Sequence, residues 1–257
     1  METAAKQLLS AAAVLLAACH SEGGKMSKFT ADAFPDPALR QAAEYVLSGN
    51  RTEAVALARQ SKSGINSVGP KGDTVLLVAV VANDSAAVEA LTRGGADPNL
   101  PTQKAPIAVA MEMAGPKVIL ALLDAGADPN GVSGSEPAIW RAALFGRKDI
   151  VEILAKARAH LNKTNQSGES PMVAAVQADN FSTALLLTRL GASPFIAAED
   201  GTTVGTWILE SRLSPVTPEG IARGQLVEAI KAKGYPWPPP SPEQVLAAKA
   251  SASWPQR

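Results

Sequence analysis

The pattern of apolar and polar residues along the chain predicts short helices that come in pairs. Apolar residues recur at intervals of three and four, as at Val118, Leu122, Ile150 and Leu154, and this spacing places them on one face of an α-helix. Four similar phrases each open the first helix of a pair, and a second periodic segment follows each of them. The phrases are DTVLLVA at 73–79, APIAVA at 105–110, PAIWRA at 137–142 and SPMVAA at 170–175.

The pairs repeat at a nearly constant step. The opening phrase returns at intervals of 31, 32, 33 and 33 residues, at Thr74, Ala105, Pro137, Ser170 and Thr203. The turn after the second helix reads GGADPN at 94–99, AGADPN at 125–130 and GASPF at 191–195. Its central position advances by 31, 32 and 33 residues, through Gly95, Gly126, Arg158 and Gly191. Two landmarks with the same step indicate a stack of similar units, because one helical pair cannot bury its apolar face alone.

The recurrent residues of the turn have structural explanations. Glycine ends a helix where the backbone becomes left-handed, which is least costly without a Cβ atom. Asp97 and Asp128 are expected to accept hydrogen bonds from the nearby turn backbone. We do not assign them to a metal, because one carboxylate per turn is far short of the roughly six oxygen ligands that calcium takes.

The step near 33 residues, the x-P-L-x-x-A opening, the I-V-x-L-L second helix and the G-A-D-x-N turn resemble the ankyrin repeat. The resemblance covers residues 38–235, about five to six repeats including caps, and implies an all-α solenoid of helix-turn-helix units. AEYVLSGNRTEAVALARQ at 43–60 is identified as the N-terminal cap. After Gly201 the pattern loosens, since Gly205 stands where the repeat has leucine and a loop at 213–220 precedes a last helix expected from Gln225 to Lys233.

Composition and charge agree with a globular helical protein. Hydrophobic residues make up 46% of the chain and aromatic residues only 4%, which favours helices joined by short turns over a β-sandwich or a barrel. The 24 basic and 24 acidic side chains cancel. Because a nucleic-acid-binding protein normally has a basic excess, we expect no nucleic-acid partner.

The N-terminus has the features of a bacterial lipoprotein signal. A polar start with Lys6 precedes an apolar run at 8–18, which is too short to span a bilayer, and Leu16–Cys19 resembles a lipobox. We expect residues 1–18 to be a signal peptide, Cys19 to be lipidated, and residues 19–37 to form a flexible tether. By resemblance, His20 after the cysteine favours the outer membrane, facing the periplasm. Alternatively, Met26 is the initiator of a shorter, cytoplasmic protein.

The inventory of reactive residues does not favour catalysis. The chain has two histidines, His20 and His160, and one cysteine, Cys19, so no catalytic triad and no Cys/His zinc site can be assembled. The segments GKMSK at 24–28 and GPKGDT at 69–74 lack the spacing of a phosphate-binding loop. We therefore expect no enzyme, no cofactor and no metal.

Binding to another protein is the remaining class of function. In an ankyrin-like stack, side chains at the finger tips and on the outward part of each first helix line one concave surface. Met113, Leu144 and Phe145 would form an apolar centre with acidic residues around it. Trp140 and Phe145 are explained equally well as core residues. The predicted surface comprises Asp73, Val81, Lys104, Glu112, Met113, Glu136, Trp140, Arg141, Leu144, Phe145, Glu169 and Gln177.

The two ends of the repeat region suggest a more specific role. MSKFTADAF at 26–34 and LVEAIKAKGYPWP at 226–238 are similar to ankyrin lipoproteins found beside secreted phospholipase effectors, which act as immunity proteins. The resemblance implies a protein that binds and neutralises such an effector, and we expect the protein to be a monomer. The alternative is a general periplasmic scaffold or a factor that protects against oxidative stress. The proline-rich tail at 236–257 is expected to be disordered, with residues 236–242 extended; the alternative for residues 243–257 is a short frayed helix.

Overall fold

The computed structural model describes residues 34–100 and 104–255, and these fall into two compact units. The first unit contains the described residues up to Pro106 together with Met113–Ala127, and the second contains Ile107–Glu112 and the residues from Asp128 onward. The predicted signal segment, Cys19 and the tether up to residue 33 lie outside the described residues. Within the described part, no helix is long and apolar enough to cross a membrane.

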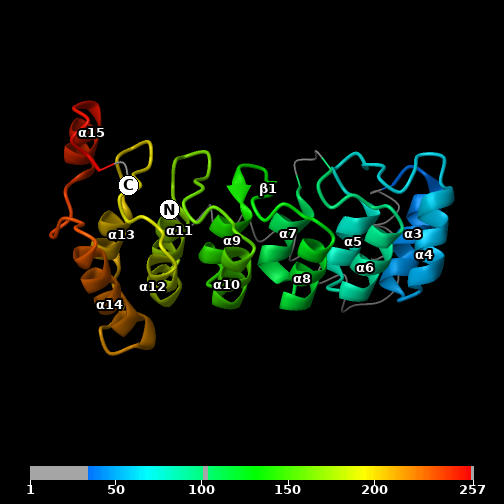
Figure 1. Cartoon of the computed structure of the whole chain (residues 1–257), viewed down its shortest axis with the longest axis horizontal. Helices are drawn as coiled ribbons and strands as arrows, with labels where there is room; N and C mark the ends of the chain where they lie inside the picture. The colour runs from blue at the N-terminus through cyan, green and yellow to red at the C-terminus, as the bar shows by residue number, and fades with distance from the viewer. Residues whose placement is uncertain (1–33, 101–103, 256–257) are drawn as a thin grey trace. The chain divides into compact units, whose positions relative to one another are not determined.

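The first unit is built from antiparallel helical pairs (Figure 1). Helix α3 packs on α4, α5 packs on α6, and contacts of α3 with α5, α4 with α6 and α6 with α8 join neighbouring repeats. Small and apolar residues fill these contacts, since Ala79, Val88 and Leu122 are all fully buried. The helices are α3 (Pro37–Leu47), α4 (Arg51–Gln60), α5 (Val75–Val81), α6 (Ser85–Arg93) and α8 (Pro116–Asp124).

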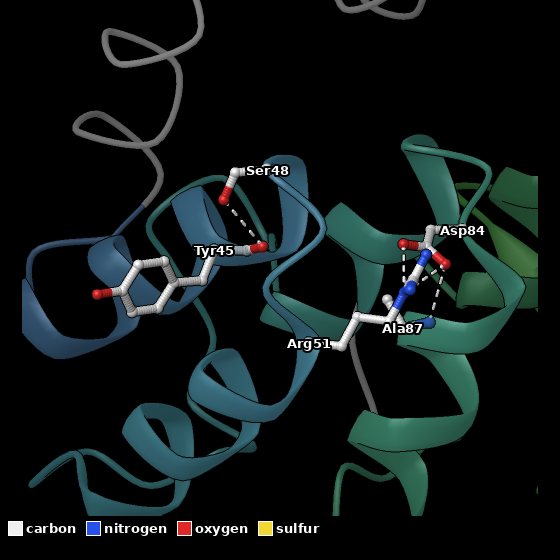
Figure 2. Close-up of polar contacts among 5 residues, drawn as sticks. All are labelled: Tyr45, Ser48, Arg51, Asp84 and Ala87. Atoms are coloured by element: carbon white, nitrogen blue, oxygen red, sulfur yellow. Dashed lines mark hydrogen bonds and ion pairs between the residues drawn. The ribbon is translucent and has the colours of Figure 1, made fainter.

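Asp84 shows how one side chain can both start a helix and join two repeats (Figure 2). Its Oδ1 accepts a hydrogen bond of 3.0 Å from the backbone N–H of Ala87, which caps the first turn of α6. Its Oδ2 lies 2.9 Å from Nε of Arg51, the first residue of α4. The start of α6 is therefore fixed to the start of α4, one repeat earlier in the chain.

The second unit continues the same arrangement and adds one small hairpin. Helix α9 packs on α10 and α11, α11 packs on α12 and α13, and α12 packs on α14. Strands β1 (Val132–Ser133) and β2 (Glu136–Pro137) pair antiparallel in the finger before α9. The helices are α7 (Pro106–Met113, with 107–112 in this unit), α9 (Ala138–Leu144), α10 (Lys148–Lys156), α11 (Pro171–Gln177), α12 (Phe181–Arg189), α13 (Val204–Glu210), α14 (Pro218–Ala232) and α15 (Pro242–Ala250).

The turn after each second helix has the backbone that the sequence predicted. Gly95, Gly126 and Gly191 have φ angles of 104°, 86° and 105°, in the left-handed region that favours glycine. Arg158 takes the same place with φ of 63°, at a cost of roughly 1–2 kcal/mol for a residue with a Cβ atom. The predicted turn bond of Asp97 is also present, since its Oδ1 accepts from the N–H of Asn99 at 2.8 Å.

Four of the turns end in an asparagine that connects the turn to the next one, whereas the turn after α12 ends in Phe195. In the first unit, Asn66 accepts from the N–H of Asp97 at 2.8 Å, and Asn99 donates to the carbonyl of Gly126 at 2.7 Å. In the second unit, Asn130 accepts from the N–H of His160 at 2.8 Å, and Asn162 accepts from the N–H of Ser193 at 2.9 Å. These bonds set the spacing of successive turns within each unit.

The last long helix begins earlier than expected. The sequence pattern predicts a start at Gln225, whereas α14 begins at Pro218. Thr217 caps it by accepting from the N–H of Gly220 at 3.0 Å, and proline occupies the first helical position. A Cβ atom on Gly220 would lie 2.0 Å from the carbonyl oxygen of Ser214, so glycine lets the preceding loop pack directly on the helix.

The C-terminal tail is described up to Pro255 and contains a helix, one of the two alternatives that the sequence leaves open for residues 243–257. It forms α15, whose Val245 is fully buried, and it places Trp254 at 7% exposure. Trp254 donates from Nε1 to the carbonyl of Phe195 at 2.6 Å, and its ring meets those of Phe195 and Tyr235 edge-on. Buried aromatic surface therefore supplies the free energy that orders the tail.

Tyr235 replaces a side chain that the last repeat lacks. The four preceding repeats place a buried residue at the position of Gly205, namely Leu76, Ile107, Ile139 and Met172. A Cβ atom on Gly205 would lie 2.6 Å from Oη of Tyr235, whose ring is 3% exposed. The Tyr235 hydroxyl and the Thr203 hydroxyl are 2.6 Å apart. Tyr235, which directly precedes the tail, thus completes the packing of the final repeat.

Replacing Tyr235 with phenylalanine is expected to change how stability depends on alkaline pH. Burial raises the pKa of Tyr235 above its usual value of 10.0, so the folded protein keeps the phenol neutral while the unfolded chain ionises. The corresponding stability is fully present below pH 10 and is lost as pH rises through the folded pKa. Tyr235→Phe removes this part of the loss and costs about 1 kcal/mol at neutral pH through the hydrogen bond to Thr203.

Urea unfolding at neutral pH and at several alkaline pH values measures both effects. Tyr45→Phe is the control, because Tyr45 is the other tyrosine of the chain. An alkaline stability profile of Tyr235→Phe that runs parallel to that of the parent protein would show that burial of this phenol does not govern the pH dependence.

Candidate protein-binding surface

Two of the predicted surface residues in the first unit form an ion pair with each other. Asp73 is 6% exposed and its Oδ1 lies 2.9 Å from Nζ of Lys104, which is half-buried. Val81 is the last residue of α5 and is also half-buried. The side chains of Glu112 and Met113 lie outside the described part of the structure. The apolar centre expected at Met113, Leu144 and Phe145 therefore stays a prediction as far as Met113 is concerned.

In the second unit, three predicted residues form one cluster on and before α9. Arg141 is 8% exposed and its guanidinium forms an ion pair with Glu136, which comes from β2. The same guanidinium lies 5.7 Å from the centroid of the Phe145 ring, within the range of a cation–π contact. Phe145 itself is 38% exposed. The cluster therefore presents an aromatic ring to solvent above a buried ion pair.

Trp140 is part of the core and not of the surface that the sequence analysis assigned to it. Its side chain is 5% exposed, and its Nε1 has no hydrogen-bond partner among the described residues. The repeat step explains the burial, because Trp140 takes the position of Leu77, Ala108 and Val173, all of which are buried. Of the two aromatic residues, Phe145 is the one that a partner can reach.

The neighbouring helix α11 carries a second polar cluster. One carboxylate oxygen of Glu169 accepts from Nε2 of Gln177 at 2.6 Å, and the other accepts from Nδ2 of Asn165 at 2.7 Å. Oδ1 of Asn165 accepts in turn from the N–H of Glu169 at 2.9 Å. All three residues are half-buried, and α11 packs against α9. The finger before α11 and its last turn are thus held together by one carboxylate.

A further asparagine, which sequence reasoning missed, fixes the end of α9. Asn180 donates from Nδ2 to the carbonyl of Leu144 at 2.8 Å. Gly146 has φ of 67°, and a Cβ atom there would lie 2.7 Å from Oδ1 of Asn180, so only glycine permits this approach. Leu144 is half-buried. Phe145 therefore lies between Leu144, whose carbonyl is bonded to Asn180, and Gly146, which cannot be replaced by a larger residue.

The chemistry of these two clusters suits contact and not reaction. Glu136 and Glu169 contribute two negative charges and Arg141 one positive charge, which leaves a net charge of −1. Each of the two carboxylates is already held by donors from its own repeat. In the described ranges, no group of three His, Cys, Asp or Glu side chains could hold a metal ion. A rigid aromatic side chain with a polar surround has the composition of a protein-binding hot spot.

Comparison with solved structures identifies the fold. An ankyrin-repeat domain from Acinetobacter baumannii AYE superposes with a TM-score of 0.63 and 23% sequence identity, covering 76% of this chain and 97% of that one. The ankyrin-repeat domain of Bcl-3, a member of the IκB protein family, gives a TM-score of 0.62 and 20% identity, covering 73% and 85%. The chain has the ankyrin-repeat fold. No family model and no curated protein sequence matches this ankyrin-repeat chain.

Removing Glu136 is expected to destabilise the ankyrin repeat that contains α9. Glu136→Ala deprives the buried Arg141 guanidinium of a carboxylate, and the loss is about 1–3 kcal/mol in the free energy of unfolding. Phe145→Ala removes a partly exposed ring and one cation–π contact, which costs less than about 1 kcal/mol. Urea unfolding measures both values. Equal stability of Glu136→Ala and the parent would show that Arg141 does not depend on this ion pair.

Proposed function

We propose that this ankyrin-repeat chain is a lipid-anchored interaction protein that binds another protein through the surface of α9 and α11. The observation that carries the proposal is Phe145, which is 38% exposed and lies above the Arg141–Glu136 ion pair. Interfaces obtain most of their affinity from a few aromatic or arginine anchors in rigid surroundings. Here the ring is held from below by a buried cation and from the side by the fixed end of α9.

The polar cluster on and before α11 also lowers the side-chain entropy that is lost when a partner binds. Glu169, Gln177 and Asn165 already form their hydrogen bonds in the free chain, so a partner that contacts them does not need to immobilise long side chains. Side-chain ordering typically costs 0.5–1.5 kcal/mol per residue on association. Ankyrin-repeat domains are in general protein-interaction modules, which agrees with a surface of this kind.

The partner that we propose is a secreted effector of the phospholipase type. The support comes from the segments 26–34 and 226–238, which resemble ankyrin lipoproteins that act as immunity proteins beside such effectors. A lipid on Cys19 would hold the protein at the periplasmic face of the outer membrane, where the phospholipid substrate of the effector lies. Binding there would block the effector before it reaches the bilayer.

Truncation of Phe145 is expected to weaken the complex strongly while leaving the fold intact. Loss of a hot-spot side chain costs at least about 2 kcal/mol of binding free energy, or roughly thirtyfold in affinity. The measurement is calorimetric titration of a purified secreted phospholipase with Phe145→Ala and with the parent chain. Leu190→Ala is a matched control, because Leu190 follows α12 directly and is also 38% exposed. Equal affinity of the two variants would exclude Phe145 as an anchor, and undiminished phospholipase activity with the parent chain bound would exclude the immunity role.

Replacing Cys19 with serine is expected to release the protein from the membrane. Serine cannot carry the thioether lipid, so palmitate labelling should be lost and the protein should move to the soluble fraction of the cell. Unfolding of the purified Cys19→Ser protein should match that of unmodified parent protein. Recovery of Cys19→Ser in the membrane pellet would contradict the anchor.

A further inference from the structure

A groove of about 370 Å3 opens between α6 and α8 in the first unit, and none of the residues assigned to partner binding above lines it. It lies on the second helices of two successive repeats, which pack against each other. Its rim carries charged side chains from both helices, and its floor is formed by small ones. The lining residues are Glu89, Thr92, Arg93, Ala96, Ala121, Asp124 and Ala125.

Small side chains on both helices leave this groove open, since α6 has Ala90 and Gly94 at the positions of Ala121 and Ala125 in α8. One and two repeat steps after Ala121 the chain has Ile153 in α10 and Leu186 in α12. One repeat step after Ala125 the chain again has alanine, Ala157, and two steps after it has Leu190. Side chains of that size would occupy the space between α6 and α8. Ala96 and Ala121 are each 5% exposed and form an apolar base for the groove.

Asp124 has a charge opposite to that of its equivalents in the other second helices. It lies in the last turn of α8, where α6, α10 and α12 carry Arg93, Lys156 and Arg189. A cation at a helix C-terminus is favoured by the helix dipole, and an anion is disfavoured by a typical 0.3–1 kcal/mol. The negative charge of Asp124 therefore lowers the stability of α8 slightly. Residues that break such a local rule are often functional.

Only one of the two carboxylates that line the groove forms an ion pair within the part of the chain that the structure describes. Glu89 accepts from Nη2 of Arg93 at 2.9 Å, which neutralises that pair. Within the described residues, no hydrogen bond or ion pair involves the Asp124 carboxylate, and Asp124 is exposed. The rim therefore has a net charge of −1, from Glu89 and Asp124 against Arg93, with the unpaired carboxylate on α8.

We infer that this groove accepts an arginine or lysine side chain of a partner protein, as a contact separate from the surface of α9 and α11. The aliphatic stem of the basic side chain lies along Ala96, Ala121 and Ala125, and its charged head binds the Asp124 carboxylate. Thr92 lines the same groove, and its hydroxyl already donates to the carbonyl of Val88 at 2.9 Å, which leaves its oxygen as an acceptor. The groove thus has an apolar base and hydrogen-bond acceptors at its rim.

Blocked arginine, Nα-acetyl-L-arginine N-methylamide, is the probe that tests the groove without any knowledge of the partner. It is titrated at low salt into the full chain carrying Cys19→Ser, with the alanine methyl groups labelled for NMR. The methyl signals of Ala96, Ala121 and Ala125 should shift, and added salt should weaken the effect because the contact is electrostatic. The corresponding blocked citrulline, which has the same shape without the charge, should produce no shift. Equal shifts with both probes, or none with arginine, would overturn the inference.

Two variants separate loss of the site from loss of the fold. Asp124→Lys restores the charge found in α6, α10 and α12, so it should abolish probe binding and yet unfold at the same or a higher urea concentration than the parent. Ala121→Ile introduces the residue of α10 and should abolish binding by filling the groove. Asp124→Asn, a milder change, should weaken binding by about 1.5- to 5-fold, the range of an exposed ion pair. Retained probe binding in Asp124→Lys would also overturn the inference.

Matched controls keep this test independent of the proposed function. Glu152→Lys changes an exposed carboxylate on the second helix of another repeat and should leave probe binding unchanged. Phe145→Ala should also leave it unchanged, even if it abolishes binding of a phospholipase. Failure of the phospholipase titration together with a positive probe titration would therefore reject the proposed partner and keep the groove.

Discussion

The hydrogen bonds of the asparagines that end four of the turns are the contacts on which the remaining structure depends. A helical pair cannot bury its apolar face alone, so each pair needs a neighbour at a defined distance and register. Asn66 and Asn99 set this register in the first unit, and Asn130 and Asn162 set it in the second. Each bond joins a side chain of one turn to the backbone of the next. Apolar packing supplies most of the stability, but these polar contacts determine which residues face one another.

The register has a direct consequence for the candidate binding surface. Helices α9 and α11 are the first helices of two successive repeats. Phe145 and the Glu169–Gln177 cluster therefore lie on equivalent parts of these two repeats. The backbone positions of both clusters are therefore prescribed by the repeat, while their chemistry is free to vary. This separation of scaffold from surface lets a repeat protein hold unusual residues, such as the buried Arg141, provided that a partner like Glu136 neutralises them.

The repeat fold was predictable from sequence because it depends on local and periodic signals. Glycine at 95, 126 and 191, buried alanine at 79, 110, 142 and 175 and the apolar stripes all repeat at one step. The ordered tail was not predictable in this way, because Trp254 contacts Phe195 across 59 residues of sequence and no pattern encodes that pairing. The early start of α14 does have a local signal, in Thr217 followed by Pro218, but the same residues also fit the loop that the sequence predicts at 213–220. Register alone would have placed Trp140 in the core, but the pairing of Arg141 with Glu136 requires three-dimensional geometry.

In the last repeat, Tyr235 fills the space left by Gly205. This replacement has a consequence for the order in which the protein folds. Most helical pairs of the chain contain their own buried residues, so they can pack as soon as the following pair has been synthesised. The repeat that contains Gly205 cannot, because the ring that fills its core lies 30 residues further along the chain (235 − 205). Since synthesis proceeds from the N-terminus, this repeat is completed after the units before it, and a ribosome that stalls between these two positions leaves its apolar interior open to water and to chaperones.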